Sequence, residues 1–365
     1  MRRTSTPSSR RSCRDDMNQL FNRRHRGTGF SLIEIMVGLV IGMISVLAIM
    51  RVFTLSEGSR RTTSGASDAQ SSGTMGLYQL QRDLRQGGQG MNSMLVLGCN
   101  VTLRAGVTIN SLAPFVINHA GIPAGDAGSD TLLIAYSGSW GSPEGTNVVQ
   151  QPATNQFTVT TPTSFVVNNW VMPSLQTRPA PCNLTMEQVV AVTTSPPVVR
   201  VTTGLAGMTG GTLYNLGTTP VVVGYAVRNG NLTACDYMTN NCSTAAGAAD
   251  PSIWVPIASN IVALRAQYGA DTSAPMDSFV DAYNQTTPTT ACGWRRISAS
   301  RVAVVARSIQ FEKTNVTTVV PTWAGTGTND IILSGNPDWQ RHRYRVFETT
   351  VPARNMAWLG VQAGC

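Results

Sequence analysis

Residues 26–50 read RGTGFSLIEIMVGLVIGMISVLAIM, and this stretch decides the architecture of the chain. Residues 30–50 are apolar or small apart from Glu34, which is the sole charge in the segment. As a helix that rises about 1.5 Å per residue, the segment is long enough to cross a hydrocarbon layer of about 30 Å. The sequence therefore predicts one transmembrane helix at residues 30–50.

Basic residues lie on one side of this span. Arg23, Arg24, His25 and Arg26 precede it, whereas only Arg51 follows closely. The excess of positive charge on cytoplasmic flanks places the N-terminus in the cytoplasm and the C-terminal part outside it. The apolar run is longer than that of a secretory signal, and no clear cleavage site for signal peptidase follows it, so we expect the span to be retained.

The overall composition excludes several classes of protein. The net charge is +8, but residues 1–29 hold eight Arg and two Asp, which leaves +2 for the rest of the chain. The basic excess is therefore a property of the N-terminus and does not indicate nucleic-acid binding. Charged residues make up 13% of the chain, about half the usual share, which together with abundant Gly, Thr and Ser favours a β-rich, loop-rich domain.

Residues 26–34 (RGTGFSLIE) resemble the cleavage and methylation signature of type IV prepilins and the related pseudopilins. Further stretches resemble PilW-type minor pilins: residues 128–132 (GSDTL), 263–271 (ALRAQYGAD), 280–283 (VDAY), 294–308 (WRRISASRVAVVARS) and 341–355 (RHRYRVFETTVPARN). The resemblance implies that a prepilin peptidase cuts between Gly29 and Phe30, removes the leader at 1–29 and methylates the new amine. Met1 and Met17 remain alternative starts of that leader.

The resemblance also implies a function, namely a structural minor pilin in the priming or tip complex of a type IV pilus, with roles in pilus biogenesis, twitching motility and adhesion. Its implied partners are other minor and major pilins, the prepilin peptidase and the inner-membrane assembly platform, with no cofactor and no catalysis. The implied location is the inner membrane, with a periplasmic C-terminal domain, and then the pilus. Two alternatives stay open: a pseudopilin of a type II secretion system, and a membrane-anchored adhesin or DNA receptor.

Glu34 is the candidate assembly residue. An ionised side chain inside a membrane span costs a few kcal/mol unless it finds a partner. The pilin resemblance assigns that partner to the N-terminal amine of a neighbouring subunit, while the alternative is that Glu34 reaches the cytoplasmic interface. Gly38 and Gly42 form a Gly-x-x-x-Gly pair that would allow close helix packing.

The fold class predicted is α+β, with a long N-terminal helix followed by a large antiparallel β-sheet domain with loop insertions. Leu77, Leu80 and Leu84 recur at helical spacing, which predicts an amphipathic helix at residues 74–86, within a periplasmic continuation of the long helix over residues 51–90. Asp83 lies off that stripe, and the Gly-, Ser- and Thr-rich residues 57–73 weaken the helix. The domain boundaries follow as 1–29, 30–50, 51–90 and 91–365.

Short β-rich runs follow, and Asn229-Gly230 predicts a tight hairpin turn between two of them. The strands are expected at 131–136, 156–160, 187–192, 198–203, 220–228, 261–268, 301–311 and 343–351. Surface loops are expected at 138–156, 240–252 and 314–330.

Seven cysteines are present, one of them, Cys13, in the leader. The six beyond the span form an even number in an exported domain, which favours disulfides. Cys235 and Cys242 bracket a loop short enough to close locally, so we expect them to pair. Cys365, the last residue, is expected to bond an earlier cysteine.

Candidate ligand sites are few. Asp271, Asp277 and Asp281 could be considered as calcium ligands, but their spacing is not that of an EF-hand and a solvated loop is preferred. His119 and His342 are expected to be structural or on the surface. The residues Arg341, Arg343 and Arg345 are expected to share one face of a strand, with a nucleic-acid role disfavoured by the low charge of the mature chain.

Overall fold

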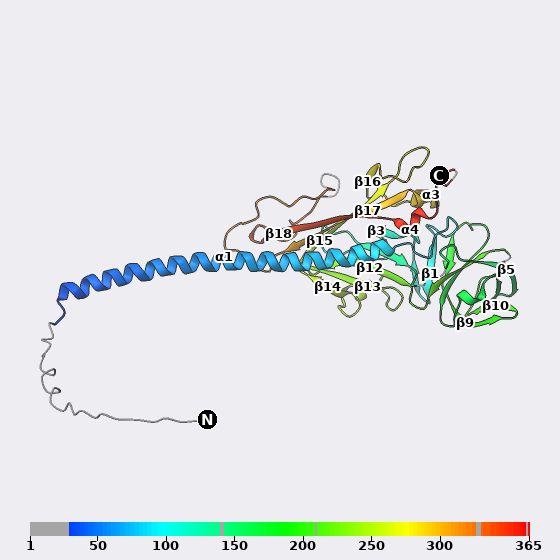
Figure 1. Ribbon diagram of the computed structural model, residues 1–365, viewed down its shortest axis with the longest axis horizontal. Coiled ribbons are helices and arrows are strands. Elements are labelled where there is room, and N and C mark those ends of the chain that lie inside the picture. Colours follow the sequence, from blue (N-terminus) through cyan, green and yellow to red (C-terminus); the bar gives the residue numbers. More distant parts are fainter. Residues whose placement is uncertain (1–28, 139–141, 209, 326–329, 363) are drawn as a thin grey trace, which may run out of the picture. The chain divides into compact units, whose positions relative to one another are not determined.

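The computed structural model describes residues 29–138, 142–208, 210–325, 330–362 and 364–365. The chain divides into two compact units, Met1–Arg60 and Arg61–Cys365. Helix α1 (Leu32–Gln86) runs from the first unit into the second (Figure 1). The predicted leader, with Cys13 and Met17, lies outside the described residues apart from Gly29.

The described residues of the second unit form three sheets and a closed barrel. A three-stranded sheet has the order β2 (Val107–Ile109), β1 (Asn100–Arg104), β8 (Asn183–Thr185). A closed barrel has the order β10 (Pro197–Val201), β6 (Gln156–Val159), β5 (Thr146–Ala153), β11 (Thr212–Gly217), β7 (Trp170–Ser174), β9 (Glu187–Thr194). A five-stranded sheet has the order β14 (Val255–Ser259), β13 (Asn231–Asp236), β12 (Val221–Arg228), β4 (Leu132–Tyr136), β3 (Phe115–Ile117). A four-stranded sheet has the order β16 (Ala282–Asn284), β15 (Ile261–Ala270), β17 (Ile297–Arg307), β18 (Tyr344–Pro352).

Short helices connect some of these strands. They are η1 (Pro162–Ser164), α2 (Ala245–Ala249), α3 (Ala291–Arg295), η2 (Trp339–Arg341) and α4 (Arg354–Ala357). In the described part of the chain, all strand pairs are antiparallel except β1 with β8. The predicted α+β architecture, a long apolar helix followed by a large antiparallel domain, is confirmed.

The second half of α1 packs on the five-stranded and four-stranded sheets at once (Figure 1). At Gly76 an added Cβ would lie 3.2 Å from Leu232 on β13, 3.4 Å from Ala258 on β14 and 3.8 Å from Val304 on β17. The buried positions of this half recur every three or four residues, at Gly65, Ala69, Gly73, Gly76, Leu80, Asp83 and Leu84. This spacing keeps one helical face against the sheets over its whole length.

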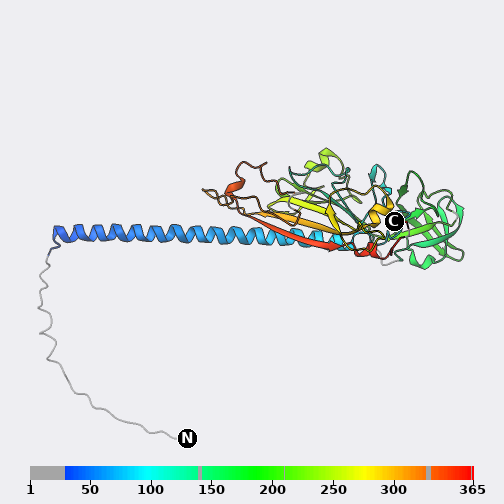
Figure 2. The same cartoon turned by 90° about the horizontal axis from the view of Figure 1, so that it is seen from above.

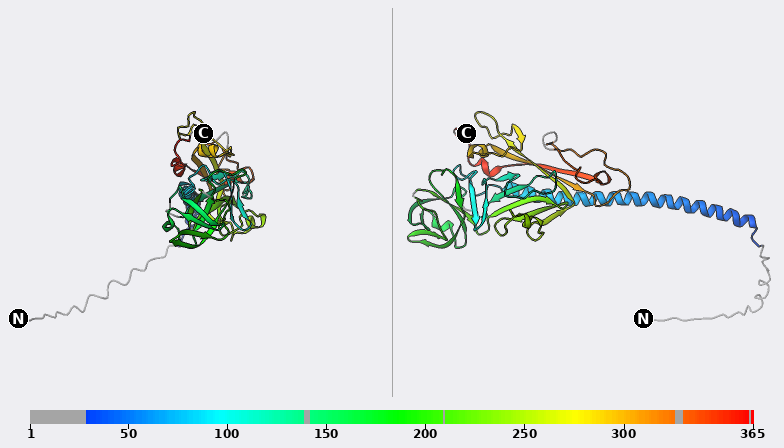
Figure 3. Two further views of the ribbon diagram at one scale, coloured as in Figure 1. Left: turned by 90° about the vertical axis from the view of Figure 1, so that its right-hand side faces the viewer. Right: turned by 180° about the vertical axis from the view of Figure 1, so that it is seen from behind.

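The barrel is the part of the fold that the sequence did not reveal. Residues 138–156 were expected to form a loop, but β5 is one of the barrel strands. Its burial alternates only over its first four residues and is mostly exposed after them, so its strand period is too short to be recognised. The barrel has its own apolar core, which includes Val148, Phe157, Val171 and Leu213. Figures 2 and 3 show it beyond the C-terminal end of α1.

Each of the predicted strands is present, with shifted ends. The strand predicted at 301–311 is β17, which begins at Ile297 and ends at Arg307. The predicted turn joins β12 to β13, with φ of 51° at Asn229 and 69° at Gly230, as a type I′ turn requires. The loop expected at 240–252 contains α2, a single short helix.

The C-terminal segment closes the end of α1. The side-chain amide of Asn355, on α4, donates to the carbonyl oxygens of Gln86 and Gly87, each at 3.0 Å. A helix leaves its last carbonyls without partners inside the helix, so Asn355 stabilises the end of α1. A disulfide then joins Cys365 to Cys292 on α3.

Candidate functional site

The predicted processing site lies directly before α1. Gly29 and Phe30 are extended or irregular, and the Ser31 carbonyl accepts the first hydrogen bond of the helix from the Ile35 amide at 3.1 Å. Phe30 is 78% exposed, and a Cβ added at Gly29 would meet nothing within 4 Å. The backbone at this junction is therefore open, as a site for a peptidase must be.

Glu34 lies in the first turn of α1 and is exposed. Among the described residues it has no hydrogen bond or ion pair. The helix dipole stabilises a carboxylate in the first turn. This stabilisation is smaller than the free-energy cost of placing the charge inside a membrane. A partner from outside the described part of the chain would therefore still stabilise it.

Gly38 and Gly42 open a shallow apolar groove on the same helix. Its walls are formed by Ile35, Leu39, Met43 and Val46. An added Cβ would meet nothing within 4 Å at either glycine. A second helix could therefore approach the backbone closely along this groove.

The apolar side chains of this half of α1 are uncovered within the unit. Every large apolar side chain from Phe30 to Leu55 exposes more than half of its surface. Within the described residues, α1 is the one helix long and apolar enough to cross a membrane. Contact with lipid or with other helices would remove this surface from water.

A buried carboxylate anchors the other half of α1 to the sheet. Asp83 is 3% exposed and accepts hydrogen bonds from the hydroxyls of Tyr136, at 3.3 Å, and Tyr225, and from Arg82 Nε at 3.1 Å. Burial and the Asp83 charge raise the pKa of Tyr136 to about 12, and the same causes raise the pKa of Tyr225. The expectation that Asp83 lies off the buried face was wrong, because two tyrosines supply the partners that a buried carboxylate needs.

The six cysteines beyond the span form three disulfides. Cys235 is bonded to Cys242 across the short loop, with a Cα–Cα distance of 6.0 Å. Cys365 is bonded to Cys292. The remaining pair, Cys99 and Cys182, joins the segment after α1 to the start of β8.

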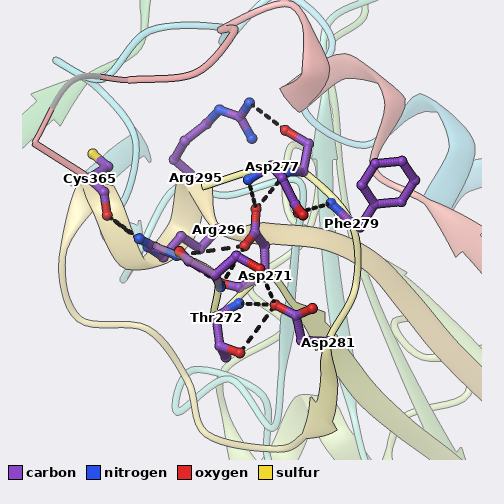
Figure 4. A network of polar contacts seen from close by, with 10 residues as sticks. Asp271, Thr272, Asp277, Phe279, Asp281, Arg295, Arg296 and Cys365 are labelled. Carbon is purple, nitrogen blue, oxygen red and sulfur yellow. Dashed lines mark hydrogen bonds and ion pairs between the residues drawn. The ribbon is translucent and has the colours of Figure 1, made fainter. Parts of the chain in front are cut away.

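The aspartates of the 271–281 loop organise the backbone. Asp271 is 1% exposed and accepts hydrogen bonds from the amides of Ser273, Asp277 and Ser278, while Arg296 Nη1 lies 3.7 Å from its Oδ1 (Figure 4). Asp281 accepts from the Thr272 amide at 2.7 Å. No group of three or more His, Cys, Asp or Glu side chains that could hold a metal ion occurs among the described residues.

The arginine stripe predicted on one strand face is wrong. Arg341 ends η2, Arg343 precedes β18, and only Arg345 lies within that strand. Arg341 and Arg343 are paired with Asp338 and Glu312, at 3.8 and 3.5 Å. Strand β18 begins only at Tyr344, because Arg341 still belongs to the 3-10 helix η2.

The two histidines of the second unit are buried. His119 is 4% exposed and His342 is 9% exposed. The Gly121 amide donates to His119 Nδ1 at 3.0 Å, which assigns the ring proton to Nε2, 2.7 Å from the Asn110 carbonyl. Burial lowers the pKa of His119, so the ring is held neutral as a structural group.

Two family models match this chain. The prokaryotic N-terminal methylation motif matches residues 24–50, and the type IV pilus-assembly protein W family matches residues 225–355. A solved type IV-like pilin from Thermus thermophilus is similar at 11% identity and a TM-score of 0.33, covering 78% of this chain and 96% of that one. No curated protein matches the chain.

The methylation motif, the apolar helix and the β-sheet domain define a membrane-anchored protein of the type IV pilin class. Within that class, the match over residues 225–355 makes the chain similar to the PilW-type minor pilins of type IV pili. Neither match includes residues 51–224, the interval that contains every strand of the barrel.

Proposed function

We propose that this minor pilin belongs to the priming or tip complex of the pilus. The observation that supports this position is that the barrel lies beyond the C-terminal end of α1 (Figures 2 and 3). In a filament whose subunits stack through their N-terminal helices, the space beyond that end is needed by the subunit above. A subunit at the tip has no such neighbour and can carry the additional domain.

The assembly mechanism that we propose uses Glu34 as the partner of a neighbour's N-terminal amine. The chain enters the inner membrane with its N-terminus in the cytoplasm, the prepilin peptidase cuts after Gly29, and the amine of Phe30 is methylated. The open backbone at Gly29 and the exposed position of Glu34 support this sequence of events. The groove at Gly38 and Gly42 would receive a neighbouring pilin helix. The partners are other minor and major pilins and the assembly platform, and the subunit carries out no catalysis.

Intact-mass analysis of the membrane form tests the processing step. We expect a chain that begins with N-methylated Phe30, and a chain that begins upstream of Phe30 would contradict the proposal. Immunogold labelling of sheared filaments tests the position of the subunit. We expect label at filament ends, and label along the filament would contradict a tip position.

Glu34→Leu tests the pairing with a neighbour. We expect normal abundance of the variant in the membrane but a several-fold loss from sheared filaments, because the charge that attracts the neighbouring amine is gone. Ser45→Leu is the matched control, since it also makes the span more apolar without removing a charge. Entry of both variants at wild-type levels would overturn the pairing. Secretion measured in the same strains separates this role from that of a type II pseudopilin.

A further inference from the structure

A cavity of about 390 Å³ lies on the four-stranded sheet. Arg307 on β17 and Tyr344 on β18 are direct partners in the strand register, and both line it. Val305, two residues before Arg307, belongs to the small apolar cluster with Trp323 and Leu333, whereas its neighbour Val304 faces α1 at Gly76. Because side chains alternate along a strand, Arg307 and Tyr344 lie on the face turned away from α1.

The guanidinium of Arg307 is not used by the fold. Among the described residues it has no hydrogen bond or ion pair, and its Nε is buried without a partner. Buried polar groups in proteins are nearly always satisfied, so an arginine that lines a cavity without a partner is available to a ligand. The guanidinium offers a planar fork of N–H donors that matches the two oxygens of a carboxylate.

Other polar groups also line the cavity. The Asp126 carboxylate accepts hydrogen bonds from the amides of Asn229, at 2.9 Å, and Gly230, at 2.8 Å, which fixes the hairpin as part of the wall. Asn336 uses its Oδ1 to accept from the Asp338 amide at 3.0 Å. Its amide nitrogen has no partner among the described residues and can donate to a ligand.

We propose that this cavity binds a small molecule with one carboxylate and several hydroxyl groups. A single arginine fork accommodates one carboxylate, while the negative charge of Asp126, which also lines the cavity, repels a second anionic group. Hydroxyls can donate to the remaining lone pairs of Asp126 and accept from the Asn336 amide. The volume lies at the small end of the range for ligand pockets and suits a ligand the size of one sugar ring.

The probe for this site is D-glucuronate, with D-glucose as the neutral control and inorganic phosphate as the anion control. Binding is measured by ligand-observed NMR and calorimetry on the processed full-length chain in detergent micelles. We expect D-glucuronate to bind at least tenfold more tightly than either control. No binding of D-glucuronate, equal binding of D-glucose, or tighter binding of phosphate would each overturn the proposal.

Arg307→Gln identifies the residue responsible. We expect at least a tenfold loss of affinity for D-glucuronate, equivalent to about 1.4 kcal/mol, with Arg200→Gln on the barrel surface as the matched control. Ile332→Trp is a second variant, which fills the cavity from its exposed rim and should abolish binding while leaving the sheet intact. Unchanged affinity in Arg307→Gln or in Ile332→Trp would overturn the site. The site does not depend on assembly, so Glu34→Leu should bind D-glucuronate normally.

Discussion

Gly73 of α1 lies against the ring of Phe347 on β18, and a Cβ added at position 73 would overlap that ring. Glycine inside a helix costs about 1 kcal/mol relative to alanine. The close approach of helix and strand offsets this cost, because it lets the phenyl ring pack directly on the helix backbone.

Gly73→Ala is therefore expected to destabilise the second unit by about 1–3 kcal/mol, even though alanine favours the helix. The measurement is urea unfolding followed by tryptophan fluorescence. Ser71→Ala is the control, because Ser71 is exposed on the same helix and its replacement should be neutral or slightly stabilising. Equal stability of the two variants would show that β18 can move away at no cost.

Tyr225→Phe removes a hydrogen bond to the buried Asp83 carboxylate. We expect a loss of about 1.5–3 kcal/mol in the free energy of unfolding, since a hydrogen bond to a charged group is worth more than one between neutral groups. Tyr237→Phe is the matched control, because the Tyr237 hydroxyl donates to a neutral acceptor, the Gly121 carbonyl, at 2.7 Å. A larger cost for Tyr237→Phe would contradict the anchoring role of Asp83.

His119 makes the stability of the second unit depend on pH. Burial lowers the pKa of His119 in the folded state, so below the ordinary pKa of about 6.5 the unfolded chain binds more protons than the folded one. Stability is therefore lost as pH falls from 7 towards the folded pKa, by at most about 1.4 kcal/mol per pH unit from this group. Urea unfolding at several pH values should show a shallower slope for His119→Gln. Parallel curves for the two proteins would contradict this prediction.

The disulfides should differ in their effect on stability. Replacing Cys235 and Cys242 by serine opens a loop with a separation of 7 residues, at a cost of about 2.5 kcal/mol. Replacing Cys292 and Cys365 opens one with a separation of 73 residues, at a cost of about 4.5 kcal/mol. Thermal unfolding of both double variants measures the order, and a reversed order would show that strain outweighs loop entropy here.

The sequence predicted those features that depend on local pattern. The apolar run with Glu34 and the Asn229-Gly230 turn are each encoded within a few residues, so they could be read directly. Asp83 and Gly73 could not be interpreted, because the groups that explain them, Tyr225 and Phe347, lie far away in the chain. The same holds for Arg307, whose cavity is assembled from six separate segments.

The barrel was missed for a different reason. Its strands are short and only partly alternating, and closure of the barrel depends on pairs such as β10 with β6 and β11 with β5. Local propensity predicted β6, β9 and β10, but it predicted neither β5, β7 and β11 nor the closure of the six strands into a barrel. The tyrosines that bind Asp83 and the long-range disulfides Cys99–Cys182 and Cys292–Cys365 are likewise specified only when the sheets have formed.

Because Asn355 caps the end of α1, the packing of α1 can be completed only after residue 355 has been synthesised. The face of α1 that carries Gly73 and Gly76 is made early, but its partners on β13, β14, β17 and β18 and its terminal cap are made more than 140 residues later. Until then the helix has no sheet to pack on, so a chain truncated before residue 355 should expose this face and be prone to aggregation and proteolysis. A nascent subunit is thus protected from proteolysis and aggregation only when β18 and α4 have packed against α1.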